Sequence, residues 1–228
     1  MKPTLKVFLF IAALALTACN KTTPINEIEG FDYGRVRNDK YTNTFFDIEF
    51  NIPKGWQIQD DKQKKELMKE GSDLVFNDEE TKKAAIKSSD ITSANLLTAI
   101  SNNPGTTGFA HNILLLAENM EQHPSVVTGD IYLQSVSKIL SSGKLEIIQM
   151  DRSFPKKVLN GKDYYEMSMA AHIQGMDVHQ TYLITIDKGF AVGFIYSYVN
   201  DEQKAELEKI IQSLKPYKGN RAASHENN

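Results

Sequence analysis

The chain has 228 residues, with 26 Lys and Arg against 29 Asp and Glu and a formal net charge of −3. This length suits one domain with terminal segments. The slight acidic excess without a basic block excludes a nucleic-acid-binding protein, because such proteins need clustered Lys and Arg to displace the counterions of the phosphates. Cys19 is the only cysteine, so no disulfide forms within one molecule and packing alone must stabilise the fold.

The first residues have the features of a secretory signal. Residues 1–6 carry two lysines and no acid, and residues 7–16, VFLFIAALAL, form an apolar run of ten. About 20 apolar residues are needed to span a bilayer, whereas about 7–15 suit the apolar region of a signal peptide. The following tetrapeptide, LTAC at residues 16–19, resembles the lipobox of bacterial lipoproteins. This resemblance implies that residues 1–18 are removed as a signal peptide and that Cys19 carries acyl chains such as palmitate. The alternative is an ordinary signal peptide with a cysteine near its cleavage site.

The lipobox resemblance also predicts a location. Two or more acyl chains hold a protein stably at a membrane. Asn20 occupies the position where an Asp favours retention at the inner membrane in enterobacterial lipoproteins. We therefore expect the periplasmic face of the outer membrane if the host is Gram-negative, and the outer face of the plasma membrane otherwise. Without residues 1–18, which hold two lysines and no acid, the net charge becomes −5.

The remaining chain divides into three segments. Residues 19–40 are polar and lack periodicity, which predicts a lipid anchor followed by a flexible tether with a reach of roughly 25 Å. Residues 41–217 form one continuous pattern without an internal repeat, and we expect them to be the folded domain. Residues 218–228 are polar again and are expected to be a disordered tail.

The domain begins with two strands and two polar helices. We predict a strand over residues 46–52, a turn at residues 53–55, a short strand over residues 56–59, and helices over residues 61–70 and 79–87. The first strand is indicated by apolar and polar residues that alternate with a period of two. Gly71 is expected to end the first helix, and Asp78 is expected to cap the amino end of the second.

The apolar pattern in the middle of the chain predicts two strands at the centre of a sheet. Residues 94–100 and 112–119 are apolar on both parities, which is typical of strands covered on both faces. The loop between them, SNNPGTTGFAH, is interpreted as a long hairpin connection, with a functional loop as the alternative. A helix over residues 130–142, followed by Gly143, and a strand over residues 145–150 complete this part.

The C-terminal third predicts a meander of three strands and a final helix. The strands cover residues 164–173, 178–186 and 190–198, and the helix covers residues 201–215, with Asn200 as its cap and Pro216 at its end. Asp187-Lys188-Gly189 fits a three-residue hairpin loop. That loop would place Ile186 opposite Phe190, Ile184 opposite Val192 and Tyr182 opposite Phe194, so that the large apolar side chains share one face.

Hairpins with helices between and after them predict an antiparallel α+β fold. The segments YTNTFFDIEFNIPKGWQI at 41–58, ANLLTAI at 94–100 and GFAVGFIYSYVNDEQKAELEKIIQSLKP at 189–216 resemble bacterial members of the PsbP-like family. This resemblance implies an α/β/α sandwich and a role as an accessory subunit, an assembly factor or an exported lipoprotein of unknown role. Nothing in the chain resembles the photosystem-binding termini of plant members, so that function is not carried over.

Two histidines are the candidate metal ligands. His172 and His179 fall on the polar parity of adjacent strands, and they would face each other if the loop covers residues 174–177. Cross-strand neighbours have Cβ atoms about 5 Å apart, close enough to share a metal. Catalytic zinc normally needs three protein ligands, and only Asp177 or Glu166 are available as distant thirds. The alternative is a pair of solvated imidazoles. Two interpretations are also open for the aromatic residues of these strands, which either line a ligand groove or pack in the hydrophobic core: Tyr182, Phe190, Phe194, Tyr196 and Tyr198.

Two functions follow. The favoured one is a membrane-anchored envelope lipoprotein without enzymatic activity or cofactor, which binds or supports a protein partner. The sequence has no Gly-rich phosphate loop, no HExxH, no GxSxG and no calcium-loop spacing. The alternative is a metal-dependent or hydrolytic enzyme that uses the face carrying His172 and His179.

The lipid anchor can be tested with the native protein. We expect the purified product to enter the detergent phase in a cloud-point extraction, because acyl chains on Cys19 partition with the micelles. Recovery in the aqueous phase, with an unmodified peptide at the amino end, would contradict the predicted location.

Overall fold

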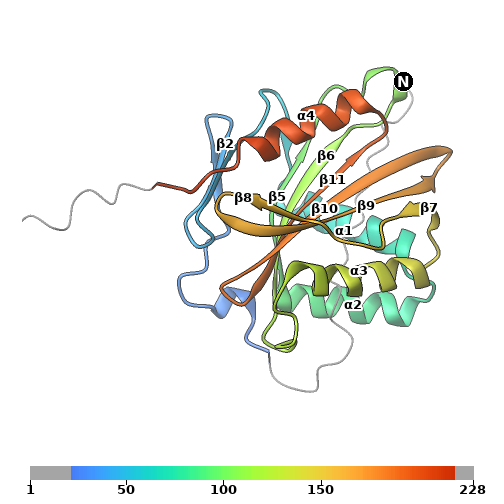
Figure 1. Cartoon of the computed structure of the whole chain (residues 1–228). Helices are drawn as coiled ribbons and strands as arrows, with labels where there is room; N and C mark the ends of the chain where they lie inside the picture. The colour runs from blue at the N-terminus through green and yellow to red at the C-terminus, as the bar shows by residue number, and fades with distance from the viewer. Residues whose placement is uncertain (1–21, 219–228) are drawn as a thin grey trace, which may run out of the picture.

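A central antiparallel sheet of eight strands organises the domain (Figure 1). The computed structural model describes residues 22–218. The strand order is β4-β5-β6-β11-β10-β9-β7, and β8 pairs with β9 on the same edge as β7. The strands are β4 (Gln57–Ile58), β5 (Ser93–Ile100), β6 (Asn112–Asn119), β7 (Glu146–Met150), β8 (Lys156–Leu159), β9 (Lys162–Ile173), β10 (Met176–Asp187) and β11 (Phe190–Tyr198).

Both faces of this sheet are covered. One face carries α1 (Asp61–Val75), α2 (Glu79–Thr92) and α3 (Gly129–Ser142). The other carries α4 (Asp201–Gln212) and a small sheet of β1 (Arg35–Arg37), β2 (Lys40–Asn43) and β3 (Ile48–Asn51). Figure 1 shows α2 and α3 on one side of the sheet and α4 on the other. The predicted α+β class with an antiparallel sheet is therefore confirmed.

The two layers enclose two hydrophobic cores that share the sheet. The core on the side of α1–α3 is built around the fully buried Leu133, Leu140 and Met167. The core on the side of α4 and the small sheet is built around Phe46, Leu115 and Leu207. Every residue of β6 and β11 is buried, so these strands contribute to both cores. The central position expected for residues 94–100 and 112–119 is confirmed.

The helix starts follow the expected capping chemistry. The side chains of Asp78 and Asn200 accept hydrogen bonds from the backbone N–H of Thr81 and Gln203, respectively. The predicted helix ends were less accurate, because α1 continues through Gly71 to Val75. Val75 is fully buried in the first core. Its burial outweighs the cost of about 1 kcal/mol for a glycine inside a helix.

The predicted register of the β10–β11 hairpin was wrong by one residue. Lys188 and Gly189 have φ angles of 52° and 79°, which is the two-residue type I′ turn. Ile184 therefore lies opposite Gly193 and Tyr182 opposite Ile195. Because both faces of β11 are buried, the apolar pattern fits either register, and the turn geometry decides between them.

The prediction of a flexible tether was also wrong for residues 22–40, the part of it that the structure describes. Ile25 lies in the short 3₁₀ helix η1 (Ile25–Glu27), is 3% exposed and belongs to the second core. The backbone N–H of Thr23 donates to Glu121, and the amide of Asn119 donates to the Thr23 carbonyl oxygen. Residues 35–37 pair with β2. The domain therefore begins well before residue 41, whereas the signal peptide, Cys19 and residues 219–228 lie outside the described residues.

Within residues 22–218, no helix has the length and hydrophobicity that crossing a membrane would require.

The hairpin register can be tested at Gly193. A Cβ atom at this position would collide with Cδ1 of Ile184. We expect Gly193→Ala to lower the free energy of unfolding by about 1–3 kcal/mol, because inserting a methyl group overpacks the core. Ile184→Val removes that Cδ1 atom, so the double variant should be more stable than Gly193→Ala alone. Urea unfolding followed by circular dichroism measures both effects. Additive losses in the double variant would contradict the register.

Candidate functional site

His172 and His179 do not lie directly opposite each other. The β9–β10 loop is the two-residue turn Gln174-Gly175, with φ angles of 50° and 84°. His172 is therefore paired with Asp177, and His179 with Ala170. The two imidazoles share a sheet face but are offset diagonally. The predicted opposition was wrong because the loop contains two residues instead of four.

Each histidine contacts a different side chain instead of the other histidine. Nδ1 of His172 lies 2.8 Å from Oδ1 of Asp177, and this hydrogen bond raises the pKa of His172 above its ordinary value. The ring of His179 stacks on Tyr198 with centroids 5.4 Å apart. Among residues 22–218, no three His, Cys, Asp or Glu side chains are grouped so that they could hold a metal ion. Metal binding by His172 and His179 stays a prediction.

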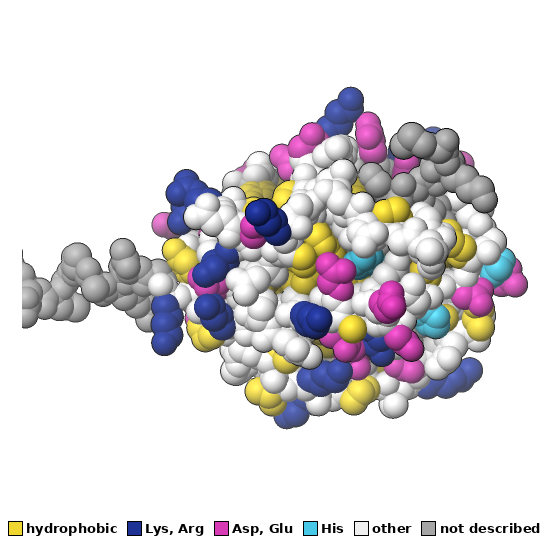
Figure 2. Space-filling view, turned by 90° about the horizontal axis from the view of Figure 1, so that it is seen from above, with side chains coloured by type: hydrophobic (Ala, Val, Ile, Leu, Met, Phe, Trp, Pro, Cys, Tyr) yellow, Lys and Arg dark blue, Asp and Glu magenta, His cyan; other side chains and the backbone are white. Residues whose placement is uncertain are grey.

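The face above the sheet has no dominant charge. Figure 2 shows basic, acidic and histidine side chains dispersed among uncharged and hydrophobic ones. The aromatic residues of β11 beneath are buried in the second core, as one of the two sequence interpretations predicted. Tyr182 lies in the first core, on the opposite face of the sheet.

A third histidine, His111, is buried and belongs to a polar cluster that reaches the surface at Glu206. Its side chain is 3% exposed, and its Nε2 lies 2.9 Å from Oε2 of Glu206. The indole N–H of Trp56 donates to the other carboxylate oxygen of Glu206, and the Trp56 and His111 rings meet edge to face. These contacts fix the loop before β6 to α4. The interpretation of residues 101–111 as a hairpin connection between β5 and β6 agrees with this arrangement.

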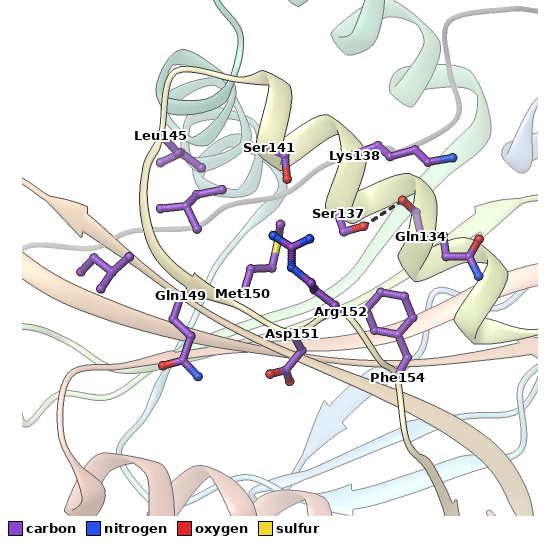
Figure 3. A pocket seen from close by; sticks show the side chains of 12 residues that line it. Gln134, Ser137, Lys138, Ser141, Leu145, Gln149, Met150, Asp151, Arg152 and Phe154 are labelled. Atoms are coloured by element: carbon purple, nitrogen blue, oxygen red, sulfur yellow. Dashed lines mark hydrogen bonds between the residues drawn. The ribbon is translucent and has the colours of Figure 1, made fainter.

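The site that sequence analysis missed is a cleft between α3 and β7. We call it the α3–β7 cleft; it has a volume of about 650 Å³. Its floor consists of apolar side chains that also pack against the first core: Leu145, Ile147, Met150 and Phe154. Its α3 side carries polar side chains: Gln134, Ser137, Lys138 and Ser141. Figure 3 shows the guanidinium group of Arg152 extending toward α3 between these two sides.

The charges of the cleft are unbalanced. Among the described residues, no acidic side chain forms an ion pair with Arg152 or Lys138. The one acidic residue of the cleft, Asp151, points away from α3 in Figure 3, and its Oδ2 accepts a hydrogen bond of 2.8 Å from the backbone N–H of Ser168. Arg152 therefore lies beside the apolar floor, and Lys138 lines the α3 side of the cleft. Neither cation has an ion-pair partner among the described residues. Isolated basic residues at 138 and 152 carry no motif, so the sequence offered no signal for this site.

The strand that borders the cleft is bulged. β7 ends the strand order of the sheet, so its outer edge has no neighbouring strand in the described structure. Ile147 pairs with Ala171 and Gln149 with Ala170, which leaves Ile148 as an extra residue that is 55% exposed. A bulge disturbs the ladder and disfavours the addition of another strand. Binding at this edge therefore depends on the side chains of the cleft.

Comparison with known proteins is informative only at the level of general fold. No protein-family model and no curated protein matches the chain. It is similar to the crystal structure of LpqN, involved in cell envelope biogenesis of Mycobacterium tuberculosis, with 12% identity, a TM-score of 0.43, and coverage of 74% of this chain and 82% of that chain. It is also similar to the solution structure of cyanobacterial PsbP, CyanoP, from Synechocystis sp. PCC 6803, with 15% identity, a TM-score of 0.44, and coverage of 89% and 99%.

A third similar structure is a protein from Bacteroides thetaiotaomicron VPI-5482, with 12% identity and a TM-score of 0.44. The alignment covers 80% of this chain but only 50% of that one. The PsbP-like family, which the sequence motifs resemble, is represented among these structures by CyanoP. Because all three TM-scores are below 0.5, we draw no conclusion about function from them.

The His172–Asp177 pair predicts a pH dependence. The hydrogen bond favours protonated His172 in the folded state, so its stabilising effect is fully present below the ordinary pKa of 6.5 and disappears as the pH rises through the folded-state pKa. We expect Asp177→Asn to lower the His172 pKa, measured by NMR titration of the imidazole signals. An unchanged His172 pKa would contradict the pairing. Coincident shifts of His172 and His179 on adding one equivalent of zinc would instead support the metal alternative.

Proposed function

We propose that the protein is a non-enzymatic lipoprotein of the bacterial envelope that binds a segment of a partner protein in the α3–β7 cleft. The observation that carries this proposal is a cleft that combines an apolar floor with two cations that form no ion pair within residues 22–218. The lipobox resemblance at residues 16–19 supports the envelope location.

The chemistry of the cleft favours one type of occupant. An apolar side chain can pack on Met150 and Phe154 and displace water from them. A carboxylate can bind the guanidinium fork of Arg152 through two parallel hydrogen bonds, with Lys138 adding a second positive charge. A short acidic segment with at least one large apolar residue meets both requirements.

The setting of the cleft favours a protein segment over a small ligand. The lining residues Gln134, Lys138 and Arg152 are exposed, whereas small-molecule sites usually enclose most of the ligand surface. Its apolar floor is fixed by the first core, and Asp151 ties the chain after β7 to β9 through two backbone contacts with Ser168. A preformed surface of this kind limits the entropy lost on binding.

The proposal can be tested by site-specific crosslinking in intact cells. A photoreactive amino acid replaces Gln149, which lines the cleft and is exposed. We expect a defined protein adduct whose crosslinked peptide contains an acidic residue. Arg152→Glu should reduce the adduct by about tenfold or more, because central arginines in interfaces typically contribute 2 kcal/mol or more.

Arg37→Glu is the matched control, since Arg37 is an exposed arginine on β1 of the small sheet. It makes the same charge change and should leave the adduct unchanged. Both substitutions should alter the free energy of unfolding by less than about 0.5 kcal/mol, as is usual for exposed positions. An adduct that Arg152→Glu does not weaken, or the absence of any adduct, would contradict the proposal.

A further inference from the structure

We propose that the end of the domain formed by residues 22–29, residues 119–127 and the Lys188-Gly189 turn lies directly against the lipid surface. We call this surface the anchor end. The inference rests on the lipid anchor at Cys19 in the proposed function. It concerns the orientation of the domain, which lipidation alone does not determine.

The first described residues are attached to the domain. Ile25 is 3% exposed in the second core, and the backbone of Thr23 is hydrogen-bonded to the side chains of Glu121 and Asn119 on both its N–H and its carbonyl group. Phe31 continues the attachment, since its ring lies 5.5 Å from that of Phe190 and 5.9 Å from that of Phe46. The segment therefore cannot act as a tether without breaking these contacts.

The remaining length of chain is short. Only two residues, Asn20 and Lys21, separate Cys19 from Thr22. Three Cα–Cα steps span at most about 11 Å. A lipidated Cys19 at the membrane surface therefore keeps Thr22 within that distance of the headgroups. A flexible tether that continued to residue 40 would instead have a reach of roughly 25 Å.

The side chains at the anchor end suit contact with a neutral lipid surface. A shallow hollow of about 690 Å³ lies there, lined by Thr23, Ile28, Met120, Pro124 and Val127 among others. Val127 is 65% exposed although it is apolar. The acidic side chains of Glu27, Glu29 and Glu121 also line the hollow.

The one lysine of the hollow has other partners. The ammonium group of Lys188 donates to the carbonyl oxygen of Phe45 and lies 5.0 Å from the centroid of its ring. The described residues of the anchor end therefore form no basic patch that would need anionic lipid, and zwitterionic vesicles are the appropriate probe.

This orientation keeps the α3–β7 cleft accessible. Val127 lies just before the amino end of α3, whereas Ser141 of the cleft lies at its carboxyl end. A helix of 14 residues is about 20 Å long. The membrane contact and the binding cleft are thus at different ends of the same helix.

Depth-dependent quenching tests the orientation in the full lipidated protein. Cys19 is acylated, so Val127→Cys and Ile148→Cys each introduce the only free thiol for a fluorophore. Both native side chains are exposed, at 65% and 55%, which makes them a matched pair. In phosphatidylcholine vesicles that contain a headgroup nitroxide lipid, we expect quenching at position 127 to be at least twice that at position 148. Equal quenching, or stronger quenching at position 148, would overturn the orientation.

Flotation of the same vesicles separates the two proposals. Protein that floats but is not quenched at position 127 would overturn the orientation and retain the anchor. Protein that does not float would overturn the anchor, and the orientation with it. Ile25→Asp should release residues 22–29 from the core, so this variant should float as before but lose at least half of the quenching at position 127. Its circular dichroism spectrum shows whether the rest of the domain remains folded.

Discussion

The structure depends on one constraint, which is that its sheet is covered on both faces. β6 and β11 have no exposed residue, because α1–α3 pack on one side and α4 with the small sheet packs on the other. A sheet of this kind needs apolar side chains on both parities of its central strands. It leaves its edges and the ends of its helices as the places where a partner can bind. The α3–β7 cleft is at such an edge, and the anchor end is at such an end.

The same constraint explains why the amino-terminal segment is part of the domain. The second core needs a cover beyond the small sheet and α4, and Ile25 and Phe31 provide part of it. Two apolar residues in a polar stretch are enough for this, since burial of each large side chain contributes about 1.5–3 kcal/mol. The segment thereby becomes part of the fold. In the proposed orientation, the same contacts would fix how a domain anchored at Cys19 is placed relative to the membrane.

In the proposed function, different parts of α3 serve the membrane contact and the binding cleft. The helix begins beside the anchor end, and its later part forms a wall of the cleft that carries Lys138. Neither region needs a catalytic group. The charged cluster that most resembles an active site, Trp56, His111 and Glu206, instead fastens the β5–β6 loop to α4.

The sequence alone determined the α+β class, the strands covered on both faces, and the caps at Asp78 and Asn200. These features arise from local chemistry and from the periodicity of one element at a time. It did not determine the β10–β11 register, because a sheet buried on both faces makes the apolar pattern compatible with either pairing. It did not determine the pairing of His172 and His179 either, because a shift of two residues between β9 and β10 leaves every side chain on the same face. The tertiary structure decided those through the Lys188-Gly189 and Gln174-Gly175 turns. It also decided that residues 22–40 pack against the domain and that Arg152 extends toward α3. Both arrangements depend on contacts between segments far apart in the chain, which local sequence patterns do not predict.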